Sequence, residues 1–144
     1  MDVRPGFLYN RMKGAQYMQI IARIQKELYA VIAPGIRSDT VILTENQREH
    51  IIKRRGQQFY DRYSMFFQEI AENPDYIFRD DRHPNTAVAC KTLNIDGAHV
   101  HLVIRLAVAE EDEGYENSVI TALIENDKRY AQRLRNKIPL YKRV

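Results

Sequence analysis

Apolar and polar residues alternate most regularly between residues 98 and 108. The even positions of this stretch are all apolar, whereas its odd positions include His99, His101 and Arg105. This alternation is typical of an antiparallel strand with one buried and one open face. Asn94-Ile95-Asp96-Gly97 predicts a hairpin turn just before it. Shorter apolar runs predict further strands at 41–43, 76–79, 86–93 and 118–124.

Helical spacing replaces this alternation in the first half of the chain. Thr44, followed three residues later by Gln47, forms a capping box, which predicts a helix that begins directly after the threonine. An apolar stripe then continues at helical spacing. Gly56 interrupts the stripe and predicts a kink or a break into two helices. Pro74 predicts the end of the helical segment.

The pattern is weaker at the two ends of the chain. Residues 1–19 mix polar and aromatic positions, and we interpret them as an arm that includes a short helix. Residues 20–32 fit a helical stripe and, only loosely, one face of a strand. Residues 127–136 predict a basic helix. Pro139 restricts pairing and leaves residues 138–144 as either a last strand or a tail.

These elements predict an α+β fold. Because helices come first and a meander of strands follows, we expect N-terminal helices packed on a mainly antiparallel β-sheet of about four strands. Residues 1–40 are expected to form an N-terminal arm or extension, and residues 41–144 the main domain. A length of 144 residues suits one domain of ordinary size.

Composition narrows the class of protein without giving its function. Apolar residues make up 44% and charged residues 28% of the chain, which excludes a disordered chain, a collagen-like repeat and a coiled-coil rod. Cys90 is the only cysteine, so the chain forms no internal disulfide and no cysteine zinc cage. The N-terminus lacks the pattern of a signal peptide and no apolar run would span a bilayer, so we expect a cytoplasmic protein that does not enter the membrane.

The charges are unevenly distributed. The 22 Lys and Arg residues exceed the 19 Asp and Glu residues by three. One basic cluster falls in the predicted helix after Thr44, a second covers residues 128–143, and acidic residues concentrate at 110–113. Two basic patches on one small domain suit a polyanionic partner such as nucleic acid. Solvated helix faces explain them equally well.

His50 and Arg54 stand four residues apart in the capped helix, which places them on one face, away from the apolar stripe. An imidazole can transfer a proton near neutral pH. A guanidinium binds phosphate oxygens through two hydrogen bonds and stabilises charge in a transition state. The pair therefore suits phosphodiester cleavage, although an exposed helix face with an incidental histidine would have the same spacing.

Other reactive side chains have simpler explanations. His99 and His101 lie on the same side of their strand, but no third zinc or copper ligand accompanies them, and we interpret them as polar groups on the open sheet face. Strand parity directs Ser118 and Thr121 to opposite faces, so only one of them can face a given cleft. Cys90 is interpreted as a small core residue.

The order and spacing of these segments resemble the phage-encoded nuclease-like domains grouped with barnase, EndoU, the tRNase colicins and RelE (the BECR superfamily). The resemblance covers about residues 41–142. It is carried by six short segments: His50-Ile51-Ile52-Lys53-Arg54, Asn73-Pro74-Asp75-Tyr76-Ile77, Asn85-Thr86-Ala87, Val100–Leu106, Asn117-Ser118-Val119-Ile120-Thr121-Ala122 and Leu140-Tyr141-Lys142.

The resemblance implies N-terminal helices, a four-stranded antiparallel sheet and an active cleft between them. It implies a ribonuclease of prophage or toxin origin that acts on RNA, with tRNA as one candidate, without a metal or cofactor, and with an immunity or antitoxin protein as a partner. By position, the catalytic residues are His50, Arg54, Thr121 and Tyr141, and the substrate-binding residues are Lys53, Ser118 and Lys142.

The mechanism implied by this resemblance uses the 2′-hydroxyl of RNA as nucleophile. His50 acts as general base or acid, and Arg54, aided by Lys53, holds the scissile phosphate. Thr121 hydrogen-bonds the phosphate or orients the 2′-hydroxyl, and Tyr141 stacks on a base or contacts phosphate. Relatives often carry a second histidine where this chain has Arg55. Either another group replaces that histidine, or the domain binds RNA without cutting it.

Two other classes of function stay open at this point. The first is a non-catalytic phage accessory module that binds nucleic acid or protein through its basic region, Lys128–Lys142. Its binding to nucleic acid should weaken steeply with salt. The second is a metal-dependent enzyme that uses His99 and His101, for which a chelator should abolish activity.

Overall fold

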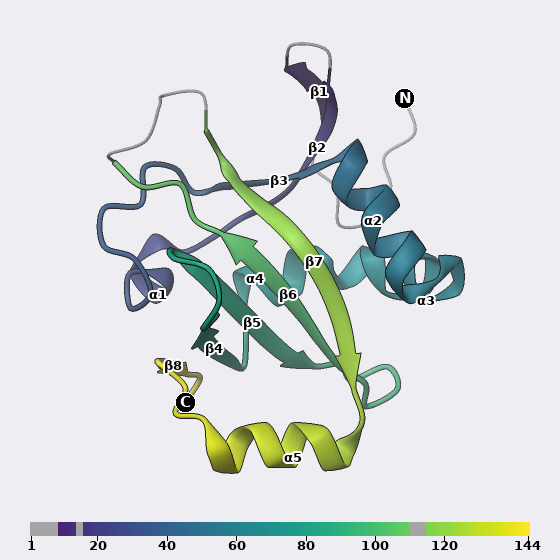
Figure 1. Cartoon of the computed structure of the whole chain (residues 1–144), viewed down its shortest axis with the longest axis vertical. Helices are drawn as coiled ribbons and strands as arrows, with labels where there is room; N and C mark the ends of the chain where they lie inside the picture. The colour runs from purple at the N-terminus through teal and green to yellow at the C-terminus, as the bar shows by residue number, and fades with distance from the viewer. Residues whose placement is uncertain (1–8, 14–15, 110–114) are drawn as a thin grey trace.

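The strands of the computed structural model join into one mixed sheet (Figure 1). The structure describes residues 9–13, 16–109 and 115–144. Over these residues eight strands lie in the order β1-β2-β3-β7-β6-β5-β4-β8, and only the β3–β7 pair is parallel. The strands are β1 (Tyr9–Lys13), β2 (Gln16–Arg23), β3 (Thr40–Thr44), β4 (Tyr76–Arg79), β5 (Thr86–Thr92), β6 (His99–Arg105), β7 (Asn117–Glu125) and β8 (Tyr141–Lys142).

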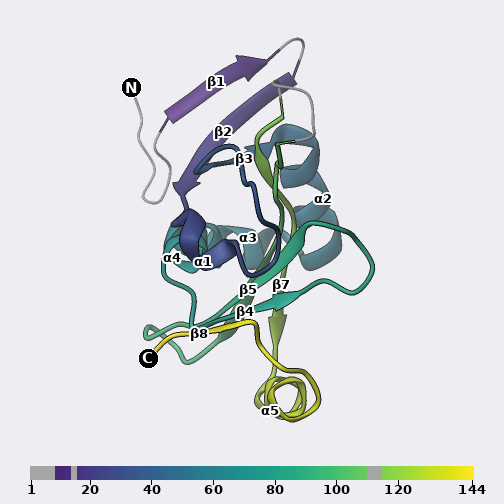
Figure 2. The same ribbon diagram turned by 90° about the vertical axis from the view of Figure 1, so that its left-hand side faces the viewer.

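Helices pack on both faces of the sheet. Figure 2 shows α1 and α4 together on one side of the central strands and α5 apart from them at the lower end. The large main core lies between the sheet and the first group of helices. The helical elements are α1 (Lys26–Tyr29), α2 (Glu45–Arg55), α3 (Gln57–Tyr63), the 3-10 helix η1 (Ser64–Phe66), α4 (Phe67–Glu72) and α5 (Asp127–Asn136).

The opposite face of the sheet is called the α5 face below, because Tyr130 and Leu134 of α5 pack on it. It carries a smaller apolar cluster. The strand residues that define this face are Phe78, Val88, Cys90 and Val103.

The expected sheet of about four strands preceded by helices is wrong. The described part of the chain has eight strands, and its first two elements are β1 and β2 rather than helices. Residues 16–23 extend the sheet, since β2 pairs with β3. Residues 20–23, the part of this strand that fitted a helical stripe, did so because β2 is buried on both sides: Ile20 packs with Ile42 in a separate cluster, while Ile21 and Ala22 enter the main core. A strand covered on both faces shows no alternation.

The strongest local signals were confirmed. The Thr44 hydroxyl accepts a hydrogen bond from the backbone N–H of Gln47 at 3.2 Å, and α2 begins at the next residue. Gly56 separates α2 from α3 with φ of +99°, a conformation that other residues rarely adopt. Val100, Leu102 and Ile104 of β6 are fully buried in the main core, as their alternation predicted.

Helix α2 lies beside the edge of β7 (Figure 1). On the β7 side, strand β3 pairs with just two residues, Asn117 and Ser118. After Thr44, the last residue of β3, the chain continues into α2. The helix contacts the later part of this edge: the Nε of Arg55 donates to the carbonyl of Ala122 at 2.8 Å. Ile51 adds a fully buried apolar contact in the main core. This attachment fixes the position of α2 relative to β7.

Asn117 locks the start of β7 in place. Its side-chain amide donates to the carbonyls of Ser38 and Thr40 at 2.6 and 2.9 Å. Its side-chain oxygen accepts from the backbone N–H of Ala107 at 2.8 Å. The side chain is fully buried, and these bonds join the segment before β3 to the segment after β6.

Candidate nucleic-acid interface

His50 and Arg54 are both exposed on α2. Ile51 is fully buried, and Ile52 packs against the main core. At 100° per residue, positions 50 and 54 project from the flank of the helix opposite to Ile52. The hydrogen bond from Arg55 to Ala122 holds this helix beside β7. The phase of the helix thus keeps the imidazole and the guanidinium accessible on a helix that borders the sheet at β7.

A β-bulge brings the two hydroxyls of β7 to the same face, so the expectation that they point to opposite faces is wrong. The register of β6 and β7 shifts between the pairs Ile104↔Val119 and Val103↔Thr121, which leaves Ile120 as an extra residue. Ser118 pairs with Arg105 and Thr121 pairs with Val103. Because positions 103 and 105 share the α5 face, both half-buried hydroxyls do so as well.

Tyr141 lies apart from this group. Strand β8 is at the other edge of the sheet, with β4, β5 and β6 between it and β7. Four strand spacings amount to about 19 Å. The Tyr141 ring packs against the main core, on the face opposite to Thr121. Lys142 pairs with Tyr76 and therefore shares the α5 face.

Ser118 and Thr121 thus share the α5 face of β7, His50 and Arg54 are exposed on the neighbouring helix α2, and Tyr141 lies outside this region. Lys53 is exposed on α2, two positions beyond buried Ile51, and so projects from the solvent side of the helix.

His99 and His101 do not lie on an open face, because α5 covers them. His101 is fully buried, and its Nε2 donates to the Oε1 of Glu125 at 2.8 Å. His99 stacks on Tyr130 of α5, with ring centroids 4.2 Å apart and planes inclined by 21°. Its two ring nitrogens lie 2.8 Å from the Thr92 hydroxyl and 2.7 Å from the Oδ1 of Asp127. The two histidines thus help to hold α5 on the sheet.

Glu125, the last residue of β7, links His101 to Arg133 of α5. The Nε and Nη2 of Arg133 donate to the two carboxylate oxygens at 2.9 and 3.0 Å. The hydrogen bond from His101, followed by those from Arg133, lowers the pKa of Glu125 to about 2. The same pairing raises the pKa of Arg133. A charged carboxylate therefore fixes the Arg133 guanidinium at neutral pH.

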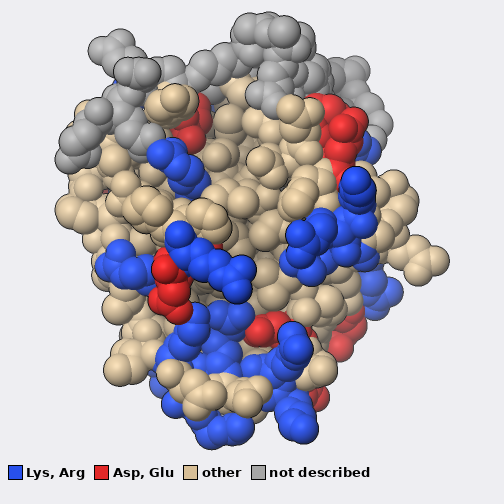
Figure 3. Space-filling model, in the orientation of Figure 1, with Lys and Arg blue, Asp and Glu red and all other residues tan. Residues whose placement is uncertain are grey.

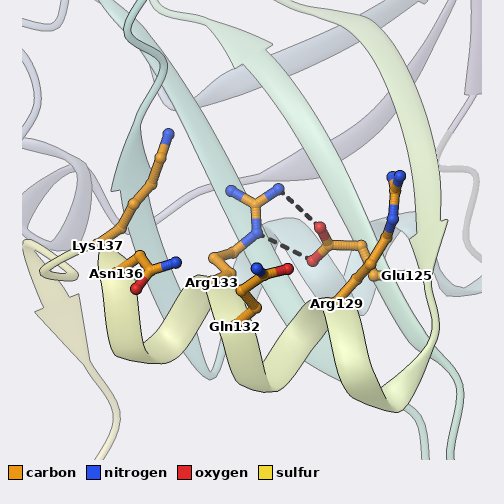
Figure 4. Close-up of a pocket in the computed structure, with 6 residues that line it drawn as sticks. All are labelled: Glu125, Arg129, Gln132, Arg133, Asn136 and Lys137. Carbon is orange, nitrogen blue, oxygen red and sulfur yellow. Dashed lines mark hydrogen bonds and ion pairs between the residues drawn. The ribbon is translucent and has the colours of Figure 1, made fainter.

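Helix α5 carries a row of three cations toward the sheet. Arg129, Arg133 and Lys137 recur every four residues, about 6 Å apart along the helix axis. Figure 4 shows their side chains side by side on the same side of α5. With Glu125, Gln132 and Asn136 they line a groove of about 320 Å³, called the α5 groove below.

The two basic helices frame the α5 face. In Figure 3, Lys and Arg side chains gather over α5 at the lower end of the molecule and again on the side where α2 lies, around a central area of other residues. The last turn of α2 contains Lys53, Arg54 and Arg55. The sequence predicted both basic segments, but it gave no sign that they border one surface.

Sequence reasoning missed Glu125 and the α5 groove, and it assigned His101 to an open face instead of to the buried contact that supports the groove. The sequence held only a weak signal for Glu125, which is its position directly before a helix cap. The next residue, Asn126, caps α5, because its side chain accepts a hydrogen bond from the N–H of Arg129 at 2.8 Å. Cys90, in contrast, is a buried core residue as predicted, and burial raises the pKa of its thiol.

The described residues contain neither a cluster of metal-ligating side chains nor a helix that could span a membrane. Among residues 9–13, 16–109 and 115–144, no cluster of three or more His, Cys, Asp or Glu side chains has the arrangement of a metal site. Within the same ranges, no helix has the length and apolar character needed to cross a bilayer.

Comparison with known proteins gives no family. The chain matches no family model, no curated protein and no solved structure. The resemblance to the BECR superfamily therefore stays a prediction.

Proposed function

We propose that the protein is a metal-independent ribonuclease that binds RNA on the α5 face and cleaves it beside α2. One observation carries the proposal: cations of α2 and α5 border the same face of the sheet, and exposed His50 and Arg54 lie on α2, beside the strand that carries the hydroxyls of Ser118 and Thr121. Phosphate contacts by Lys and Arg dominate the binding of nucleic acids. An accessible imidazole supplies the proton transfer that cleavage needs.

The proposed reaction uses the 2′-hydroxyl of RNA as its nucleophile. His50 accepts the 2′-hydroxyl proton, the 2′-oxygen bonds to the adjacent phosphorus, and the bond from phosphorus to the 5′-oxygen breaks. The products are a 2′,3′-cyclic phosphate and a 5′-hydroxyl, which takes its proton from water. Arg54 stabilises the charge that develops on the phosphoryl oxygens. Ser118 and Thr121 donate hydrogen bonds to the phosphate or orient the 2′-hydroxyl.

This proposal also sets the cellular context. A ribonuclease of phage or toxin origin acts in the cytoplasm of a bacterial cell, on cellular RNA such as tRNA. The cell that produces it then needs an immunity or antitoxin protein to survive. Expression without such an inhibitor is expected to slow growth, and His50→Ala is expected to relieve that effect.

The direct test is cleavage of a labelled single-stranded RNA by the purified full-length chain in EDTA. His50→Ala is expected to reduce the rate by about 10²–10⁴-fold, the usual contribution of a general acid or base. His83→Ala is the matched control, because His83 is an exposed histidine in the turn between β4 and β5. Cleavage by His50→Ala at the wild-type rate would contradict the assignment.

A non-catalytic RNA-binding module is the second candidate. Arg55 stands where domains of the BECR superfamily, which the sequence resembles, often carry a second histidine, and its guanidinium holds α2 to β7 through the Ala122 carbonyl. It therefore has a structural role and cannot exchange protons at neutral pH. If the wild-type chain binds RNA but leaves it intact in the same assay, this second function is the correct one.

A further inference from the structure

We propose that the α5 groove binds phosphate groups of nucleotides that flank the cleaved bond, so that the substrate is an extended single strand of RNA rather than an isolated phosphodiester. This inference rests on the proposed function and adds a second subsite to it. Three features of the groove support it: a guanidinium held in place, two further cations within the same groove, and the separation of the groove from the proposed cleavage site along β7.

Arg133 is held in the geometry that anion binding requires. Its Nε and Nη2 are bonded to Glu125, which is itself bonded to fully buried His101. Its guanidinium also lies 5.7 Å from the centre of the Phe78 ring. Figure 4 shows the remaining terminal nitrogen directed into the groove, on the side of Lys137. A donor fixed in this way loses little conformational entropy when it binds a phosphate oxygen.

The other two cations are available to a ligand. Among the described residues, no carboxylate lies within ion-pair distance of Arg129. The Nζ of Lys137 lies 2.8 Å from Asp81, but these side chains are 43% and 72% exposed. Exposed pairs of this kind contribute little and exchange readily with other anions. Three cations therefore face a single fixed carboxylate, Glu125, and the groove keeps a positive surplus.

The chemistry of the groove favours RNA over a protein partner. All six residues that line it are charged or carry an amide. The centre of a protein–protein interface is usually apolar and aromatic, whereas a positively charged groove that follows one backbone is typical of single-strand binding. Gln132 and Asn136 add amide donors beside the cations.

The groove and the proposed cleavage site lie apart on the α5 face. Glu125, which lines the groove, is the last residue of β7 and stands four residues beyond Thr121. Four residues of a strand span about 13 Å. A phosphate in the groove therefore belongs to a different nucleotide from the cleaved bond, and a dinucleoside monophosphate, which has a single phosphate, cannot occupy both places.

The test measures the salt dependence of RNA binding in a chain that does not cut. The full-length His50→Ala protein is titrated with a labelled 12-nucleotide single-stranded RNA at several salt concentrations. Adding Arg129→Ala and Lys137→Ala should weaken binding and reduce the slope of log K against log salt by about 1.4, since each lost phosphate contact removes about 0.7. Arg133 is left unchanged because its loss would remove two of the hydrogen bonds that hold the Glu125 carboxylate.

The matched control adds Lys128→Ala and Arg135→Ala, which remove the same charge from the same helix outside the groove. This control should keep the parent slope. Equal slopes for the two double variants would overturn the inference, and they are the result expected if the groove takes an acidic protein instead. If the parent His50→Ala chain binds no RNA at all, the proposed function itself fails.

Cleavage kinetics give a second readout. In the wild-type background, Arg129→Ala with Lys137→Ala should raise the KM for the 12-nucleotide RNA and leave the cleavage rate of a dinucleoside monophosphate unchanged. If the two substitutions impaired cleavage of both substrates to the same extent, a separate subsite would be contradicted.

Discussion

Helices α2 and α5 are both basic and both border the α5 face, yet they are attached to the sheet in different ways. Helix α2 is anchored by an apolar contact of Ile51 and one hydrogen bond of Arg55. Helix α5 is anchored by stacked rings and by the chain of polar contacts His101–Glu125–Arg133. The same kind of basic sequence thus serves two purposes: α2 leaves His50 and Arg54 accessible for chemistry, and α5 fixes a guanidinium for binding.

The largest expected effect is a loss in the free energy of unfolding when the attachment of α5 is broken at Glu125. Glu125→Ala removes a carboxylate that is 11% exposed and leaves buried His101 and Arg133 without their partner. Breaking a buried charged network in this way costs about 4 kcal/mol. Urea denaturation measures the loss. Asp81→Ala breaks only the exposed pair with Lys137 and should cost less than about 1 kcal/mol. Similar losses for the two variants would show that the network does not anchor α5.

Acid should weaken the attachment of α5 more than that of α2. Hydrogen bonds from His101 and Arg133 lower the pKa of Glu125 from 4.5 to about 2. A carboxyl with a lowered folded-state pKa stabilises the fold above its unfolded pKa, and this contribution disappears as the pH falls from 4.5 to 2. The expected loss is about 3 kcal/mol. The measurement is the free energy of unfolding at pH 5, 4 and 3.

Glu125→Gln is the reference for that experiment. The pKa values of Asp80 and Asp96 are also lowered, so the variant should keep part of the acid sensitivity. The difference between wild type and variant isolates Glu125. Parallel curves for the two proteins over this pH range would contradict the assignment.

A smaller effect is expected at α2. Arg55→Ala removes the hydrogen bond to the Ala122 carbonyl, which should cost about 1 kcal/mol in the free energy of unfolding. Lys53→Ala, on the solvent side of the same helix, should leave that free energy nearly unchanged. If Arg55→Ala is as stable as Lys53→Ala, Arg55 is not needed to hold α2, and its role must be sought in RNA binding.

Local signals in the sequence predicted elements better than their arrangement. The alternation of β6, the cap at Thr44 and the break at Gly56 are properties of neighbouring residues, and all three were confirmed. Strand β2 was missed because burial on both faces removes alternation. The extra residue Ile120 reversed the faces expected from parity. Bulges depend on the partner strand and leave little trace in one sequence.

The candidate site was predicted in part. Ser118 and Thr121 share one face of β7, and His50 and Arg54 are exposed on the helix beside that strand, while Tyr141 lies at the other edge of the sheet. The α5 groove depends on contacts between residues that are 8 and 24 positions apart in the chain, from Glu125 to Arg133 and to His101. No short motif encodes such contacts, because they form only when the chain folds back across the sheet.

The most direct test of RNA binding on the α5 face is to map which elements of the protein one RNA contacts. A 12-nucleotide RNA with photoreactive bases, bound to the full-length His50→Ala chain, is cross-linked and the modified peptides are identified by mass spectrometry. If RNA binds on the α5 face, we expect cross-links to α2 or β7 and to α5, the elements that border this face. Cross-links confined to α1 and α4, on the other side of the sheet, would contradict it.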